Sequence, residues 1–297
     1  MVLLDLLVQQ AKSPQPKVPS QTSQASGLQL SAKDFRLVVA HYDHGIREDS
    51  KVDRLFVQQT ARTYGLPFVY DKGSLGPRAS EAQARTARYG FLEAARQATQ
   101  AQAIVTAHHQ DDQLETAFIN SLRGTGRRGL TALRSRLTLL RPLLGTPKSE
   151  LLAYAQTNGI KWHEDSTNKD ARYLRNHIRR HLLSKLPAPD RDQLTHLITE
   201  LMDTNDQIDR ILVNHLHTQP VPGELNRQWF IMLPHVVATE IMMTWLRAHD
   251  VDNLDKKRLE LLTAKAKTLD VGKRVVVDAN RVIEIGKDSL ALAVAER

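Results

Sequence analysis

The sequence predicts an α/β protein with a doubly wound parallel sheet, followed by a small α+β domain. Short apolar runs at residues 35–40, 67–70 and 103–107 alternate with helical patterns at residues 53–64 and 80–99, which is typical of parallel strands connected by helices. Two of the runs end directly in polar clusters, at His41 and at His108. Because ligands of such sheets bind beyond the carboxyl ends of the strands, both clusters are expected to line one crevice.

The first 160 residues contain the signals for three further elements. Residues 1–8 have apolar side chains at helical spacing and are expected to form a buried helix. Residues 11–31 are rich in Pro, Ser and Gln and are expected to form a surface loop. Thr146 is expected to cap a helix that has Pro147 in its first turn and Gly159 at its end.

The second half of the chain reads as helices first and strands last. Helical patterns cover residues 171–183, 190–217, 234–248 and 254–269, and short strands are expected at 274–277, 282–285 and 290–294. The domain boundaries that follow are 1–188 for the sheet, 189–218 for a linking helix and 219–297 for the small domain.

Composition narrows the classes of function. The chain has 41 Lys and Arg against 33 Asp and Glu, a net charge of +8 and a pI near 9.7, which suits a polyanionic partner. It contains no cysteine, so disulfides and thiolate chemistry are excluded. No apolar run approaches the roughly 18 residues of a membrane span, so a cytoplasmic protein without a membrane partner is expected.

The first polar cluster contains His41, Asp43, His44 and Arg47. These residue types can hydrogen-bond a nucleotide and neutralise phosphate. Taken alone, so short a motif is more often a polar loop with histidines in its turns.

The second cluster is more specific, because it combines His108 with Asp111, Asp112 and Glu115 at the start of a helix. Acids one turn apart share a face of the helix. Such a set can hold Mg²⁺ and provide a base, since Mg²⁺ prefers one or two carboxylates together with substrate phosphates. The competing interpretation is that acids in a first turn only stabilise the helix.

Arginines dominate two later segments. Arg123, Arg127 and Arg128 are separated by glycines, which let a backbone approach a phosphate. Arg172, Arg175 and Arg179 form one stripe of the helix over 171–183, and this stripe has no acidic partner on the same helix. An anionic ligand and a solvated face explain such a stripe about equally well. Trp162 and Tyr173 can stack on unpaired bases, although an aromatic residue beside an apolar stripe is more often part of the core.

Six motifs in order resemble those of the tRNA(Ile)-lysidine synthetases, a family of PP-loop ATP pyrophosphatases. They are His41-Tyr-Asp-His-Gly-Ile-Arg, Glu81-Ala-Gln-Ala-Arg-Thr-Ala-Arg-Tyr-Gly-Phe-Leu, Thr106-Ala-His-His-Gln-Asp-Asp-Gln-Leu-Glu-Thr, Arg123-Gly-Thr-Gly, Arg141-Pro-Leu-Leu and Tyr173-Leu-Arg-Asn-His-Ile-Arg. The resemblance covers about residues 1–185, and the small domain is similar to the family's first accessory domain.

The resemblance implies an enzyme that uses ATP and Mg²⁺ to adenylate the C2 oxygen of the wobble cytidine in an isoleucine tRNA with a CAU anticodon. Free L-lysine then displaces AMP through its ε-amino group. The implied partners are the anticodon loop of that tRNA, lysine and ATP, and a homodimer is compatible with the family.

The matching positions imply specific roles. Those implied for catalysis are His108, Asp112, Glu115 and Arg88; for ATP, His41, Asp43, His44, Arg47 and Arg85; for the metal, Asp111 and Asp112; and for tRNA, Arg123, Arg127, Arg128, Arg172, Arg175, Asn176 and Arg179. Glu115 and His108 are the candidates for the base that deprotonates the lysine amine.

One departure from the family concerns the start of the sequence. The family's Ser-Gly-Gly-x-Asp-Ser loop, which binds pyrophosphate at a helix start, does not occur, and residues 1–8 resemble the helix that follows it. The sequence is therefore expected to begin downstream of the natural start, and the sheet to have a gap at its central strand.

Two alternatives remain open. A tRNA thiolase of the same superfamily would share the nucleotide crevice, but the lack of cysteine argues against sulfur transfer. A tRNA-binding relative without catalytic activity would agree with the missing loop, and it would bind tRNA but not ATP.

Overall fold

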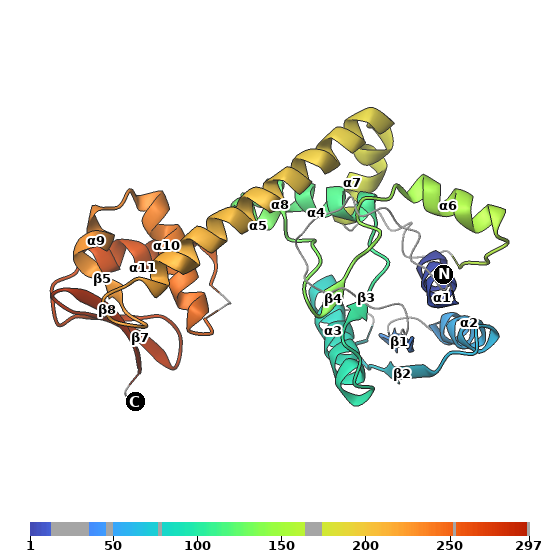
Figure 1. Cartoon of the computed structure of the whole chain (residues 1–297), viewed down its shortest axis with the longest axis horizontal. Coiled ribbons are helices and arrows are strands. Elements are labelled where there is room, and N and C mark those ends of the chain that lie inside the picture. Colours follow the sequence, from blue (N-terminus) through green and yellow to red (C-terminus); the bar gives the residue numbers. More distant parts are fainter. Residues whose placement is uncertain (13–35, 46–49, 77–78, 164–173, 252–253, 296–297) are drawn as a thin grey trace. The chain divides into compact units, whose positions relative to one another are not determined.

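The structure, a computed structural model, describes residues 1–12, 36–45, 50–76, 79–163, 174–251 and 254–295. It divides into two units (Figure 1). Unit 1 contains residues 1–123 and 132–195, and unit 2 contains residues 124–131 and 196–297. This division differs from the predicted boundaries in two places. The segment 124–131 belongs to unit 2, and the predicted linking helix, α8 (Ala188–His217), is shared between the units instead of standing apart.

Unit 1 has the predicted alternation of strands and helices. Its elements before α8 are α1 (Val2–Lys12), β1 (Val39–Asp43), α2 (Ser50–Thr63), β2 (Phe68–Lys72), α3 (Glu81–Ala98), β3 (Ile104–Val105), α4 (Gln110–Leu122), β4 (Leu139–Leu140), α6 (Lys148–Thr157), α7 (Leu174–His181) and a 3₁₀ turn at Leu183–Lys185. The α/β fold class is confirmed. The predicted loop at 11–31 lies mostly outside the described residues.

The described strands of unit 1 form two separate parallel pairs. Strand β1 pairs with β2 in the register Val39↔Phe68 to Asp43↔Lys72, and β3 pairs with β4. The two pairs are not hydrogen-bonded to each other within the described part of the chain. Residues Val39, Ile104 and Val105 stay half-buried, whereas the strands of a covered parallel sheet are buried on both faces.

The first turns of two helices in unit 1, α3 and α6, are capped in different ways. Ser80 caps α3, because its hydroxyl accepts a hydrogen bond from the Gln83 backbone N–H and the Gln83 side chain accepts one from Ser80, as in a capping box. The prediction that Thr146 caps α6 is wrong: Pro147 is the N-cap of that helix. The backbone of Thr146 is engaged in a turn, where its N–H donates to Leu143 and its carbonyl accepts from Gln110.

A buried carboxylate connects three segments of unit 1. Asp5 of α1 is 9% exposed. It accepts hydrogen bonds of 2.8 Å from the hydroxyls of Tyr64, just after α2, and Tyr154 in α6, and a third of 2.8 Å from the amide of Gln9. Burial and the bond to Asp5 raise the pKa of Tyr64 to about 12, so this tyrosine stays a donor at neutral pH.

Unit 2 is a small α+β body with its own core. Its antiparallel sheet has the strand order β5-β8-β7-β6, with β5 (Leu225–Asn226), β6 (Arg274–Val276), β7 (Arg281–Ile285) and β8 (Ser289–Val294). Its remaining helices are α5 (Arg127–Leu130), α9 (Arg227–Met232), α10 (His235–Ala248) and α11 (Lys256–Thr268). Phe230, Trp245 and Ile283 are buried in the core, and Trp245 also donates to the carbonyl of Gly223. Among the described helices of both units, none is long and apolar enough to cross a membrane.

Replacing Asp5 by Asn is expected to destabilise unit 1. The amide has one acceptor oxygen in place of two, so at least one buried donor loses its partner, at a cost of about 1–3 kcal/mol. Urea denaturation of the full chain measures this change, with Asp71→Asn at an exposed site of the same unit as the control. Equal stability of the two variants would contradict a structural role for the Asp5 hydrogen bonds.

Candidate active site

The first polar cluster lies at the end of β1. The sequence placed its residues after the strand, but pairing with β2 includes His41 and Asp43 in β1 itself. Asp43 is 6% exposed and accepts hydrogen bonds from the Gly45 N–H (2.8 Å) and the Ser50 hydroxyl (2.9 Å). Burial alone would raise the pKa of Asp43, but these bonds lower it.

A sharp turn follows the cluster. Gly45 has φ +65°, and a Cβ atom there would lie 2.2 Å from the carbonyl oxygen of Gly73, so the turn requires glycine. His44 lies edge-on to Tyr42, with 5.0 Å between the ring centroids. The predicted ATP residue Arg47 lies outside the described residues.

The second cluster lies where β3 leads into α4. Asp112 accepts a hydrogen bond of 3.1 Å from the backbone N–H of His109, so it does stabilise the start of the helix. One carboxylate oxygen of Asp111 is 3.8 Å from Arg191 on α8, and the other oxygen is buried without a hydrogen-bond partner among the described residues. Gln110 donates 2.8 Å to Asp192. The start of α4 is therefore held by the beginning of α8.

Glu115 is fully buried and pairs with the helix α7. Its two oxygens accept hydrogen bonds of 2.5 Å and 3.0 Å from Arg179, whose guanidinium also lies 3.7 Å from Asp112. Arg175 lies 3.8 Å from Glu115 and 3.4 Å from Glu81 on α3. Burial raises the pKa of Glu115, against the effect of Arg179. The arginine stripe of α7 therefore has acidic partners, which come from other helices.

These carboxylates allow a test of the predicted Mg²⁺ site. No group of three His, Cys, Asp or Glu side chains in the described residues could hold a metal by itself. Mg²⁺ often takes one or two protein carboxylates and completes its shell with phosphate and water. The free buried oxygen of Asp111 and the neighbouring Asp112 fit such a partial site.

His108 stands among positive charges. The pKa of His108 is lowered to about 4, first by burial and then by Arg141, Arg88 and Arg85, while Asp112 acts in the opposite direction. Its Nδ1 lies 2.8 Å from the hydroxyl of Thr106. His108 is therefore a neutral imidazole at neutral pH.

Two residues of this environment, Tyr89 and Arg141, were not among the predicted site residues. Arg141 follows β4, is 5% exposed, donates to Tyr89 and Arg134, and its Nε has no partner among the described residues. The sequence did contain a signal, because Arg141 and Tyr89 both belong to the six motifs. It did not show that they meet.

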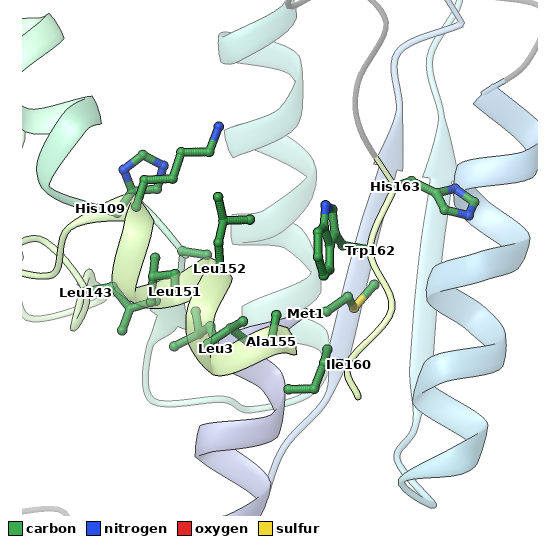
Figure 2. A pocket seen from close by; sticks show the side chains of 13 residues that line it. Met1, Leu3, His109, Leu143, Leu151, Leu152, Ala155, Ile160, Trp162 and His163 are labelled. Atoms are coloured by element: carbon green, nitrogen blue, oxygen red, sulfur yellow. The ribbon is translucent and has the colours of Figure 1, made fainter. Parts of the chain in front are cut away.

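An apolar pocket of about 340 Å³ opens beside His109 (Figure 2). Leu151, Leu152 and Ala155 of α6 line it together with Leu3 of α1 and the ring of Trp162. Trp162 is 40% exposed, so its ring is accessible as the stacking prediction requires. Tyr173, the other predicted stacking residue, lies outside the described residues.

Two of the predicted tRNA arginines form an ion-pair cluster within unit 2, which we call the arginine clamp. Arg127 lies 2.6 Å from Asp209 of α8 and 2.8 Å from Glu240 of α10, and Arg128 lies 2.7 Å from each of them. Arg127 also donates 2.9 Å to Asn205. The clamp fixes the glycine-rich segment 124–131 in unit 2.

The remaining predicted tRNA contacts differ in exposure. Arg123 ends α4 and is exposed, whereas Asn176 is buried in α7. Arg172 lies outside the described residues. Unit 1 contains 26 Lys and Arg against 18 Asp and Glu, and unit 2 contains 15 of each. The whole excess of +8 belongs to unit 1.

The chain is similar to known proteins over its first two thirds. Residues 1–186 match the family model of the PP-loop domain. The chain is 39% identical over 164 residues to the tRNA(Ile)-lysidine synthase of Thermus thermophilus, covering 53% of this chain and 32% of that protein. It is 41% identical over 186 residues to that of Synechococcus, covering 61% and 52%, and 32% identical over 240 residues to that of Ralstonia nicotianae, covering 77% and 52%.

The chain thus spans between about a third and a half of the length of these curated relatives. Among solved structures, the U34-tRNA thiolase NcsA from Methanococcus maripaludis aligns with a TM-score of 0.46 and 15% identity over 57% of this chain and 63% of that one.

His108 is expected to titrate far below an ordinary histidine. Because the folded pKa of about 4 lies below the 6.5 of an ordinary histidine, proton binding favours the unfolded state. The contribution of His108 to stability is then present above pH 6.5 and is lost as the pH falls toward 4. A ¹³C NMR titration of labelled histidines measures this, with His108→Gln for assignment. A midpoint near 6.5 would contradict the described environment.

Removing one acid of the arginine clamp is expected to destabilise unit 2. Asp209→Asn leaves two half-buried guanidiniums short of a counter-ion, and a loss of about 1–2 kcal/mol follows once solvent screening is considered. Hydrogen exchange of amides in α10 measures the loss. Asp203→Asn, at an exposed position of the same helix, is the control, and equal protection in both variants would show that the clamp contributes nothing.

Proposed function

Because this chain belongs to the PP-loop family and to its tRNA(Ile)-lysidine synthase branch, we propose that it converts the wobble cytidine of an isoleucine tRNA with a CAU anticodon to lysidine. The observation that carries this proposal is the position of His108 and the acids of α4 beside Arg85, Arg88 and Arg141, directly after a parallel strand.

The reaction takes place in two balanced steps. The C2 oxygen of the cytidine attacks the α-phosphorus of ATP, the bond to pyrophosphate breaks, and an adenylated cytidine forms. The ε-amino nitrogen of lysine then attacks C2, the bond between C2 and the oxygen breaks, AMP leaves and the nitrogen loses a proton. Anionic charge therefore develops on phosphate oxygens in the first step, where fixed cations stabilise it.

The arginines of unit 1 provide such cations. Arg88 and Arg85 have no carboxylate partner within 4 Å among the described residues. We assign them to the phosphates of ATP, with His41, Asp43 and His44 at the neighbouring strand end. If Mg²⁺ binds with ATP, Asp111 and Asp112 are the carboxylates that would hold it, and its charge would offset that of the phosphates.

Glu115 and Arg179 act as a pair in this proposal. Both oxygens of Glu115 are occupied by Arg179, so Glu115 would accept a proton only after that arginine moves away. His108 is neutral and has no such partner, and we assign it the proton of the lysine amine. Glu115 then serves to hold Arg179 at the acids of α4.

tRNA binding is assigned mainly to unit 1. Its excess positive charge suits a phosphate backbone, and Arg123 is exposed at the end of α4. The cytidine has to leave the anticodon stack to reach the site, which a single-stranded loop permits. The apolar pocket lined by Trp162 offers a planar base a surface on which to stack.

The Asp112→Asn variant tests the division of roles. We expect at least about a 100-fold loss of tRNA-dependent AMP release, a size typical for the removal of one group that stabilises charge in a transition state. Affinity for tRNA should stay within about threefold, because Asp112 is assigned to Mg²⁺ and, as an anion, is not expected to contribute to binding of the phosphate backbone. The measurements are AMP release, lysidine in the digested tRNA by mass spectrometry, and tRNA binding by filter retention.

Glu150→Gln is the control, since Glu150 is also an acid in the first turn of a helix, α6, but is exposed. Equal losses of tRNA affinity in both variants would contradict the assigned roles. A parent chain that binds tRNA but releases no AMP would favour the alternative of a tRNA-binding relative without catalytic activity.

A further inference from the structure

An aromatic side chain in unit 1 supports two arginines without neutralising them. The guanidinium of Arg85 lies 4.8 Å from the centre of the Tyr89 ring, and that of Arg88 lies 5.5 Å from it. A ring face attracts a guanidinium through its quadrupole and leaves the full positive charge in place. A carboxylate would hold the same arginines but would compete with an anionic ligand.

The ring of Tyr89 is held in place by a buried cation, Arg141. Arg141 donates a hydrogen bond of 3.3 Å to the hydroxyl of Tyr89 and another to the carbonyl of Arg134. Its side chain is 5% exposed, and its Nε has no hydrogen-bond partner in the described part of the chain. Burying a charge without a counter-ion is costly, so its retention here needs an explanation beyond packing.

The acids that could neutralise this group are occupied elsewhere. Glu81 of α3 lies 3.4 Å from Arg175, and Glu115 is held by Arg179. Burial lowers the pKa of Arg88, and the neighbouring Arg85 and Arg175 lower it further, against the effects of Tyr89 and Glu81. Arg85 and Arg88 are therefore two like charges held at one ring, and an anion between them would relieve their repulsion.

We propose that Tyr89 and Arg141 are positioning residues, which hold Arg85 and Arg88 as an unneutralised pair that binds a phosphate group of the substrate. The ligand chemistry is a phosphate dianion or diester, supplied either by ATP or by the tRNA backbone. The inference rests on the proposed function, and it adds two residues that touch no substrate themselves.

The test compares the full-length variants Tyr89→Leu and Tyr89→Phe. Loss of the ring should raise the dissociation constant for ATP, or for tRNA, by roughly 3- to 30-fold, the range that cation–π energies give. Tyr89→Phe keeps the ring but loses the hydrogen bond from Arg141, so its loss of affinity should be smaller than that of Tyr89→Leu, about threefold. The ligand whose affinity falls identifies the source of the phosphate. Calorimetry with ATP and filter binding with tRNA are the measurements.

The control is a variant at an exposed position of the same helix, α3. Gln97→Ala lies at such a position and should leave both affinities unchanged. In the modification assay, Tyr89→Leu should raise the KM of the affected substrate and leave kcat nearly unchanged, whereas partial unfolding would lower kcat.

If Tyr89→Leu does not fold, Arg141→Met is the second variant, and a loss of about threefold, like that of Tyr89→Phe, is expected because both variants remove the bond between Arg141 and the Tyr89 hydroxyl. Unchanged affinity for both ligands in a folded variant overturns the inference while leaving the proposed function intact. A parent chain that binds neither ATP nor tRNA overturns the proposed function. In that case inorganic pyrophosphate is the probe, and equal binding by parent and Tyr89→Leu overturns the inference too.

Discussion

A carboxylate without any exposed surface has to be neutralised inside the protein, and the rest of the candidate site depends on how this is done for Glu115. Arg179 supplies two hydrogen bonds to it, and in doing so it packs α7 against α4. Arg175, one turn earlier on the same helix, is directed to Glu81. Replacing a buried ion pair by apolar residues is often harmless, but removing one partner is strongly destabilising. The pair therefore fixes α7 in place.

These ion pairs determine which arginines keep their charge available to an anionic ligand. The acids near α4 are few, and Arg175, Arg179 and Arg191 take them. Arg85, Arg88 and Arg141 have only an aromatic ring, a hydroxyl and a carbonyl as described partners. In unit 2 the charges are matched in number, and Arg127 and Arg128 bind acids in the arginine clamp. The net positive charge of the molecule thus belongs to unit 1, which contains the proposed phosphate site.

The sequence predicted features that depend on local chemistry. The helix over 80–99 was predicted from its pattern, and its capping box joins two residues close in the chain, Ser80 and Gln83, although it was not predicted. Strands β4 and β5 have two residues each and give no periodic signal; they exist because a neighbouring strand pairs with them. The start of β1 was placed too early for the same reason, since its register with β2 sets its limits.

The sequence predicted where the candidate site lies, but not which of its charged side chains form ion pairs with each other. Polar clusters at two strand ends indicated where chemistry takes place. The partners of the arginines could not be read, because Arg179 and Glu115 are 64 residues apart and Arg128 and Glu240 are 112 apart. In the sequence, a basic stripe on one helix looks the same whether its partner is a phosphate or a carboxylate from a remote part of the chain. Only the tertiary fold separates these two cases.

The field of the unpaired arginines also bears on proton transfer. A histidine whose pKa is about 4 is a weak acceptor at neutral pH, since a general base works best when its pKa lies near the operating pH. A phosphate charge bound about 7 Å from His108 would act on it with roughly 2 kcal/mol at an effective dielectric constant of 20, which is more than one pKa unit. Each further phosphate charge that Mg²⁺ does not offset would add to this effect. Under the proposed function, binding of ATP would therefore move the pKa of His108 toward neutrality, and the base would become effective only when the nucleotide that reacts first is in place.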